Sequence, residues 1–228
     1  IGRDLPGNAD AVLTNGGGFV IKNDATATTT GNGEAEALVY VGRSSEGEGA
    51  AVWQTYSAAG DLNVALNNTG SLSIRADASA TSKESWAEAD ANIDAGIVQN
   101  GVVGTPATTI ESATVAATGH GNLALKISNT GTINLTSSAV ANAGMNADAD
   151  ADIDFAISQQ AVNHSPATAA TSSVAAFVPS ASAELINAKG AQINVMATAT
   201  ANGTYADEGW DVAEASADID EGIDQFAQ

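Results

Sequence analysis

Apolar or small residues occupy every second position over long stretches of this chain. After Gly70 the series runs Leu72, Ile74, Ala76, Ala78 and Ala80, with polar side chains in between. A period of two places one set of residues on one face of a β-strand, whereas a helix would distribute them around its circumference. Alanine has the highest helix propensity of all residues, but the spacing outweighs it. The pattern predicts strands with one buried face.

The same alternation recurs in four copies, each after a turn signal of asparagine and glycine. The turn segments are 13–17, 66–70, 127–131 and 186–190, and their glycines recur at intervals of 53 to 61 residues. Asparagine and glycine tolerate the left-handed backbone angles of a sharp corner. We therefore expect structural turns at Gly17, Asn68, Gly70, Asn129, Gly131 and Gly190.

A second alternating strand follows in each copy. The pattern places Ile153, Ile157 and, between them, Phe155 on its inward face, with Glu221 at the equivalent position of the last copy. Each of these strands ends close to a glutamine. Because equivalent residues of stacked copies lie above one another, the glutamines predict a ladder of side-chain amides. The ladder consists of Gln54, Gln99, Gln159 and Gln225.

The chain is expected to form one elongated repeat domain over 1–228, with repeats of about 13–65, 66–126, 127–185 and a truncated 186–228. Isolated alanine-rich strands do not offset their ordering entropy, but stacked copies share a continuous core. We predict an all-β chain, a β-solenoid (parallel β-helix-like) of about three and a half repeats. Each repeat is either two coils of about 30 residues or one flattened four-sided coil. The alternative fold is an antiparallel β-sandwich with a thin alanine-rich core.

The composition limits the classes of partner that the chain is expected to bind. Aromatic residues make up only 4% of the chain, so a core of alanine, valine and isoleucine requires two closely spaced layers. The formal net charge is −20, with 27 acidic residues against 7 basic ones, which excludes nucleic acid as an expected partner. No apolar run is long enough to span a bilayer, so no membrane insertion is expected. Cysteine is absent, which excludes thiolate chemistry.

The pattern Asn-x-Gly-x-Ile-x-Leu, seen at 129–135 and, with Leu and Ile exchanged, at 68–74, resembles the repeat regions of bacterial autotransporter passengers and filamentous-haemagglutinin-like surface adhesins. The resemblance covers nearly the whole chain. It implies export, an extracellular or bacterial cell-surface location, and a role in adhesion, cohesion or fibre formation. The long Ala-x-Ala strands depart from that family pattern and indicate tighter sheet packing.

Aspartates alternate with alanines in the second strand and form the strongest candidate for chemistry. Alternation places their carboxylates on the outward face, where stacked copies would build columns of like charge. Oxygen ligands of this kind suit Ca²⁺, whereas the simpler interpretation is a solvated acidic face. The EF-hand and the glycine-rich calcium nonapeptide are both absent. The candidate calcium ligands are Asp94, Asp148, Asp150, Asp152, Asp154 and Asp220.

No other motif predicts catalysis. The histidines, His120 and His164, lie in loop-like segments without a nucleophile elbow or metal-ligand spacing. We expect no catalytic residues and no cofactor apart from the candidate Ca²⁺. Threonine alternation at 26–30 resembles ice-binding faces, but the equivalent positions of the middle copies break the rank. Three tryptophans offer a sugar-stacking surface: Trp53, Trp86 and Trp210.

These features favour a structural or adhesive module of an exported bacterial surface protein, or the subunit of an extracellular fibre. The last copy would expose strand edges to another chain, so we expect self-association end to end through β-strand edges. The alternative is a module that binds carbohydrate or a host surface. An ice-binding protein and a polysaccharide-active enzyme are less favoured.

Overall fold

A computed structural model describes residues 4–5, 7–42, 49–105, 108–110, 113–115, 119–168, 176–204 and 212–228. Within these residues the regular structure is β throughout. They include no helix of the length and hydropathy needed to cross a membrane. The strands begin where the alternation begins: β7 (Ser71–Ser82) starts directly after Gly70.

Three parallel sheets contain nearly all of the strands. The short sheet consists of β2 (Ala9–Asn15), β6 (Leu62–Asn68), β11 (Leu123–Asn129) and β14 (Ala181–Asn187). The middle sheet consists of β3 (Gly18–Thr29), β7, β12 (Thr132–Ala143) and β15 (Gln192–Asn202). The long sheet consists of β1 (Asp4–Leu5), β4 (Ala35–Val41), β5 (Val52–Ala58), β8 (Ala87–Val103), β13 (Ala147–Asn163) and β16 (Ala213–Ala227).

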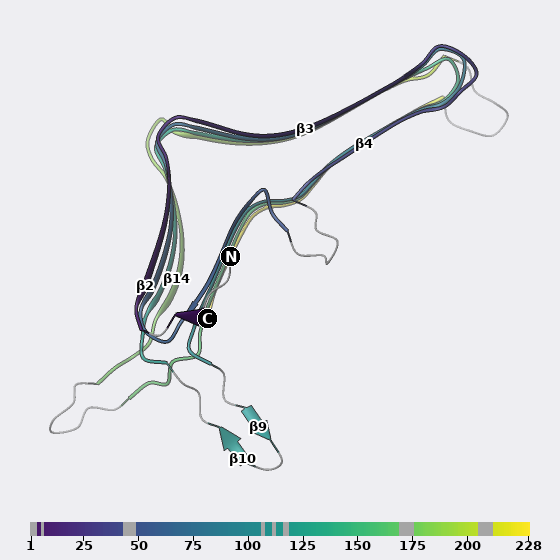
Figure 1. The fold of residues 1–228 in the computed structure, drawn as a ribbon. Coiled ribbons are helices and arrows are strands. Elements are labelled where there is room, and N and C mark those ends of the chain that lie inside the picture. The colour runs from purple at the N-terminus through teal and green to yellow at the C-terminus, as the bar shows by residue number, and fades with distance from the viewer. Residues whose placement is uncertain are drawn as a thin grey trace.

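The chain passes through the short, the middle and the long sheet in turn and then repeats the path one layer further on. We call each passage a rung: rung 1 is β2–β5, rung 2 is β6–β8, rung 3 is β11–β13 and rung 4 is β14–β16. Viewed along the stack, the rungs superpose in a bent outline with two limbs (Figure 1). Each repeat is therefore one flattened, bent rung whose sides are the short sheet, the middle sheet and the two halves of the long sheet, which agrees with the four-sided coil and not with a pair of small coils (Figure 1).

All pairing between rungs is parallel and in register, so the alternative antiparallel β-sandwich is wrong. Among the described residues, antiparallel pairing is confined to the hairpin of β9 (Thr108–Ile110) and β10 (Ala113–Val115) and to a bridge between Thr168 and Phe177. The hairpin projects from the end of one limb that lies furthest from the bend, and it joins none of the three sheets (Figure 1).

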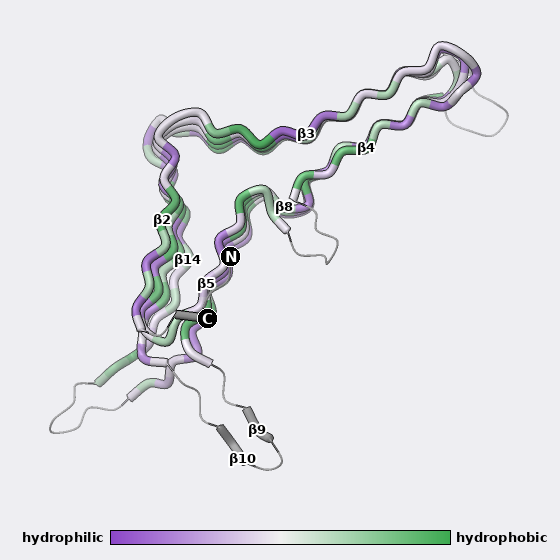
Figure 2. Tube along the Cα trace, in the orientation of Figure 1, coloured by the Kyte–Doolittle hydropathy of each residue, from purple (hydrophilic) through white to green (hydrophobic). Residues whose placement is uncertain are grey.

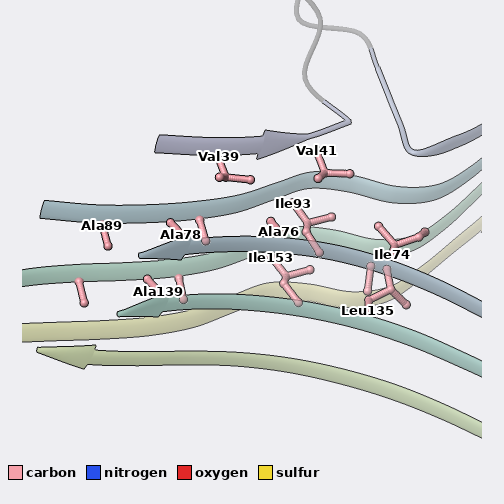
Figure 3. Packing of buried hydrophobic residues seen from close by; sticks show 14 of the residues in the cluster. Val39, Val41, Ile74, Ala76, Ala78, Ala89, Ile93, Leu135, Ala139 and Ile153 are labelled. Carbon is pink, nitrogen blue, oxygen red and sulfur yellow. The ribbon is translucent and has the colours of Figure 1, made fainter. Parts of the chain in front are cut away.

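In one limb, the middle sheet faces the first half of the long sheet, and alanines fill the space between them (Figure 3). We call this the alanine limb. Ala78, Ala89 and Ala139 are at most 3% exposed. The separation is so small that the buried Ser137 donates from Oγ to the backbone oxygen of Ala91 in the opposite sheet, at 2.6 Å. Small side chains therefore set a thin core, as the composition indicates.

In the other limb, the short sheet faces the second half of the long sheet, and leucines and valines fill the larger gap. Figure 2 shows the apolar residues of this limb alternating with polar residues along the strands. The limbs meet at a corner of the long sheet, where Ala156 and Ile157 are both buried and Phe155 is 40% exposed. The inward placement of Phe155, and with it of Glu221 in the same register, is therefore wrong.

The bend at the corner has a steric cause. Gly96 lies on the inside of the bend, and a Cβ at this position would overlap the side chain of Leu135 and the backbone oxygen of Ala156. Ala156 takes the inward place of Phe155, and from Ile157 onward the alternation continues in its original phase. A sequence pattern of period two carries no information about such a change in strand direction.

A column of buried asparagines stacks the rungs where the short sheet turns into the middle sheet. The side-chain amide of Asn15 donates to Oδ1 of Asn68 at 2.8 Å, Asn68 donates to Asn129 at 2.7 Å, and Asn129 donates to Asn187 at 2.7 Å. Asn68 and Asn129 are fully buried. The glycines beside them leave room for the backbone: a Cβ on Gly131 would overlap the carbonyl oxygen of Gly70 in the rung before it.

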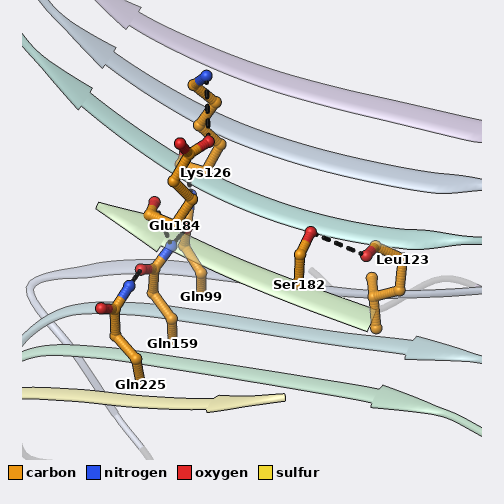
Figure 4. Close-up of polar contacts among 7 residues, drawn as sticks. All are labelled: Gln99, Leu123, Lys126, Gln159, Ser182, Glu184 and Gln225. Atoms are coloured by element: carbon orange, nitrogen blue, oxygen red, sulfur yellow. Dashed lines mark hydrogen bonds and ion pairs between the residues drawn. The ribbon is translucent and has the colours of Figure 1, made fainter. Parts of the chain in front are cut away.

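A second amide column runs along the long sheet (Figure 4). Gln99 donates from Nε2 to Oε1 of Gln54 at 2.9 Å, Gln159 donates to Gln99 at 2.7 Å, and Gln225 donates to Gln159 at 2.6 Å. The amides also reach across the limb, since Gln159 donates to the backbone oxygen of Glu184 in the short sheet at 3.3 Å. The glutamine column therefore joins rungs along the stack and sheets across it.

Replacing Asn129 by alanine should lower the free energy of unfolding by about 2–4 kcal/mol, because the buried amide of Asn68 and the amide of Asn187 would each lose a partner. Asn194 provides a matched control: its amide also donates to an asparagine of a neighbouring rung, Asn134, but this pair is exposed. Asn194→Ala should cost at most about 0.5 kcal/mol. Thermal and urea unfolding followed by circular dichroism would measure both variants, and equal losses would contradict the importance of burial.

Candidate functional site

The outward face of the long sheet in the alanine limb carries most of the acidic residues that the sequence singles out. We call this surface the acidic face. Strand alternation turns its carboxylates away from the alanine core, and register aligns them in columns along the stack. The columns are Glu36, Glu88, Asp148 and Glu214; Leu38, Asp90, Asp150 and Ser216; and Tyr40, Asn92, Asp152 and Asp218. A further group consists of Asp94, Asp154 and Asp220.

The six predicted ligands are thus distributed over four columns and do not converge on one point. Asp94, Asp154 and Asp220 lie near one another, whereas Asp148, Asp150 and Asp152 follow one another along a single strand. Neighbouring parallel strands are about 4.8 Å apart, so carboxylates of one column repel each other. No group of three or more acidic or histidine side chains among the described residues has the arrangement needed to hold a metal ion.

Burial and mutual repulsion both act on the acidic face. Partial burial, reinforced by the charges of Asp150, Asp218 and Asp154, raises the pKa of Asp152 from 3.8 to about 6. Partial burial also raises the pKa of Glu88, Asp150 and Asp154, each with a contribution from carboxylates of the adjacent rungs. The charged forms of these groups are therefore disfavoured in the folded chain.

Basic side chains do not neutralise this surface in the described part of the chain. The ion pairs there lie on the other two sheets: Lys22 with Asp24 and Asp77, Arg75 with Asp77, and Lys126 with Glu184. On the acidic face, the hydroxyl of Tyr40 donates to Oδ2 of Asp90 at 2.9 Å. Among the described residues, the face therefore presents an excess of negative charge.

A hollow of about 300 Å³ lies where the long sheet begins, at the tip of the alanine limb. Its acidic lining residues come from all four rungs, and Trp86 and Asn146 complete the wall: Glu34, Glu36, Glu88, Asp148 and Glu214. Carboxylates around an aromatic ring attract cations and offer no base–nucleophile pair. The hollow suits loosely held cations better than a chemical reaction.

Three of these acidic residues, Glu36, Glu88 and Glu214, were not singled out from the sequence. Their signal is visible there, since each lies between two alanines at the register of Asp148. The sequence pattern was interpreted through its aspartates, whereas the most regular acidic column consists mainly of glutamates.

The remaining candidates do not assemble into a site with the acidic face. His120 and His164 lie near the distal end of the other limb, where their backbone amides donate to Ala59 and Val103. Trp53 pairs with Val98 on the long sheet, so about 40 Å of strand separates it from Trp86. Trp210 lies outside the described residues. Thr26 lies in one outward column with Ser79, Val140 and Thr200, so the threonines do not form a continuous rank.

Acidification should stabilise this protein at first. A carboxyl whose pKa is higher in the folded than in the unfolded chain binds its proton more tightly when folded, so its ionisation reduces stability. For Asp152 this loss is complete above its folded pKa of about 6 and disappears below its unfolded pKa of 3.8. The melting temperature should therefore rise as the pH falls from about 7 to about 5.

Asp152→Asn should raise the stability near neutral pH by about 0.5–1 kcal/mol, since solvent screens a partly exposed carboxylate. The same variant should flatten the pH dependence. Asp10→Asn, on the outward face of the short sheet, is the control and should leave the pH dependence unchanged. Melting curves at a series of pH values would test this, and a melting temperature that falls over the same interval would contradict it.

Comparison with protein-family models, with curated proteins and with solved structures gives no match to this chain. The function must therefore be argued from the fold and from the acidic face alone.

Proposed function

We propose that this chain is a β-solenoid that serves as a structural or adhesive module, either within an exported bacterial surface protein or as the subunit of an extracellular fibre. The observation that supports this role most strongly is the register of the three parallel sheets, which is kept through all four rungs. Each rung contacts only its neighbours, so such a stack can lengthen without changing its cross-section.

The amide columns give this stack mechanical coherence. Separating two rungs breaks backbone ladders in three sheets together with a buried asparagine contact and a buried glutamine contact. Buried amides that lose their partners are costly, so the rungs separate reluctantly. A role that requires stiffness and length suits this construction better than one that requires a deep, specific pocket.

The bacterial surface location rests on the resemblance of the Asn-x-Gly-x-Ile-x-Leu turns to autotransporter passengers and haemagglutinin-like adhesins. The structure adds a reason for the acidic composition, because a long, narrow stack needs charge to keep its broad faces soluble. In this role the chain is not an enzyme, and it takes no cofactor other than Ca²⁺.

A carbohydrate- or host-surface-binding module is the second candidate. It would use Trp86 beside the hollow at the limb tip, where the indole is 41% exposed. Trp53 lies too far away to extend the same sugar-stacking platform. Neither an ice-binding face nor a groove with carboxylates and basic residues for polysaccharide cleavage is favoured by the columns described above.

Calcium is proposed to bind along the acidic face as a distributed counter-ion for Asp94, Asp148, Asp150, Asp152, Asp154 and Asp220. Millimolar Ca²⁺ should raise the melting temperature above that in NaCl of equal ionic strength, and a chelator should reverse the rise. Asp152→Asn should reduce the calcium effect, whereas Asp10→Asn should not. Identical melting curves in calcium and in chelator would contradict the proposal.

Mechanical unfolding tests the structural role itself. Pulling one chain by its ends should extend it in steps of about 20 nm, because each rung releases about 58 residues of up to 3.6 Å each. Asn129→Ala should lower the force of the steps that open rungs 2 to 4, whereas Asn194→Ala should leave it unchanged. Smooth extension at the low force of an unstructured polypeptide would contradict the proposed role.

A further inference from the structure

The end faces of the stack expose apolar residues of columns that are buried inside it, those of the short and middle sheets at rung 1 and those of the long sheet at rung 4. At rung 1, Leu13 is 41% and Phe19 44% exposed; at rung 4, Ile219 is 42% and Ile223 51% exposed. The residues of these columns in rungs 2 and 3 are at most 1% exposed: Leu66, Leu72, Ile93, Ile97, Ile127, Ile133, Ile153 and Ile157. Repeat proteins usually cover their ends with a polar cap, and no helix or separate sheet covers either face among the described residues.

The amide columns end in complementary groups. Each glutamine donates to the rung before it, so the column leaves Oε1 of Gln225 with no glutamine beyond it at rung 4. At rung 1, Gln54 donates to the backbone oxygen of Ala65 and has no earlier glutamine to receive its second N–H within the described chain. The asparagines donate in the opposite direction, so Asn187 offers a donor at rung 4 and Asn15 an acceptor at rung 1.

We infer that the rung 4 face of one copy binds the rung 1 face of a second copy, in the register that the rungs keep within one chain. This inference rests on the proposed structural role and gives it a direction, a register and a partner. Gln54 of the second copy would donate to Gln225, and Asn187 would donate to Asn15 of the second copy. The apolar contacts on exposed residues of rung 1 would be Leu185 on Leu13 and Ile193 on Phe19, and Ile219 and Ile223 would continue the columns of Val41 and Val52, which are already only 5% and 6% exposed.

The alternative contacts between like faces fail on two grounds. Two rung 4 faces would bring Gln225 acceptors together and Asn187 donors together, so neither amide column would continue. A two-fold axis across the stack would also reverse the path of the chain, and the bent outline with sheets of unequal length would no longer superpose (Figure 1). Only the unlike faces place all three sheets edge to edge, and such a heterologous contact builds an open filament.

The rung 1 face has room for this contact. β1 pairs with β5 only at Ser57 and Ala58, whereas β16, in the register of the stack, would reach Tyr56 of the second copy. On the acidic face, rung 1 carries uncharged residues in two columns: Leu38 in the column of Asp90 and Asp150, and Tyr40 in the column of Asn92 and Asp152. The contact therefore adds one like-charge neighbour, Glu214 beside Glu36, to these columns. Association should strengthen at lower pH and at higher salt.

Glycine 17 offers a specific way to block the contact. In the stack, a Cβ on Gly70 or on Gly131 would overlap the carbonyl oxygen of the preceding rung, whereas a Cβ on Gly17 meets nothing within 4 Å. In the proposed contact, the backbone oxygen of Ala191 from the other copy would take that place, as Gly17 and Gly70 do within the chain. Gly17→Ala should leave the single chain folded and still prevent association.

The experiment uses sedimentation velocity and negative-stain electron microscopy on the whole chain and two sets of variants. Leu13→Lys and Gly17→Ala block the rung 1 face, and Ile223→Lys and Ile219→Lys block the rung 4 face. Val20→Lys and Thr200→Lys are the controls, because both side chains point outward from the end rungs and their columns contain no charged residue. The wild type and the controls should form rods that lengthen with concentration, whereas every end variant alone should associate at least tenfold more weakly.

Mixing distinguishes the direction of the contact. An equimolar mixture of Leu13→Lys and Ile223→Lys leaves one intact face of each kind, so it should form dimers and nothing longer. Dimers of either variant alone would overturn the inference, because they would show a contact between like faces. A wild type that remains monomeric up to about 1 mM at pH values near both 7 and 5 would also overturn it. A monomer that still unfolds rung by rung under force would leave the structural role intact.

Discussion

The structure depends on how closely two sheets approach across the alanine limb. Alanine side chains allow this approach, and the bond from Ser137 to the backbone oxygen of Ala91 shows how little space is left. In rung 1 the same column holds Asn23, whose amide reaches the backbone oxygen of Tyr40 at 3.0 Å. A layer this thin tolerates no slip of register, since a shift by one residue would turn every alanine outward.

The same register creates the electrostatic conflict of the molecule. A column that stacks alanines on the inside stacks their neighbours on the outside, so acidic residues at equivalent positions meet at strand spacing. Asp152 shows the result most clearly, because burial and four neighbouring carboxylates act on it together. The amide columns resolve the equivalent problem without charge: an amide is both donor and acceptor, so identical residues can stack favourably. Asparagine and glutamine therefore stabilise the repeat, and aspartate makes it sensitive to ions and protons.

The sequence predicts those features that repeat with the rung. Parallel stacking, the alanine face and the glutamine column follow from period-two alternation locked to the Asn-x-Gly turns, whereas Asn68 and Asn129 were predicted as turns and not as a hydrogen-bonded column. The bend at Gly96 could not be predicted, because it depends on contacts with Leu135 and Ala156 from the neighbouring rung. At that bend, Phe155 turns outward and Ala156 is buried. The acidic face was predicted in part: its aspartates were identified, but Glu36, Glu88 and Glu214 become significant only when register aligns them with Asp148.

The ends of the stack show how a repeat fold is limited by the interaction that builds it. Every device that holds one rung on the next is directional, so the last rung necessarily exposes what the inner rungs bury. Natural sheets blunt such edges with charged residues, proline or bulges. Lys22 lies on the edge strand β3, but it pairs with Asp24 and Asp77 and points away from the edge contacts. At rung 4, β15 continues its regular alternation to Asn202. Because these edges remain regular, each of them can still accept another rung. The two ends of the stack carry different hydrogen-bonding groups, so rungs can be added in one direction only.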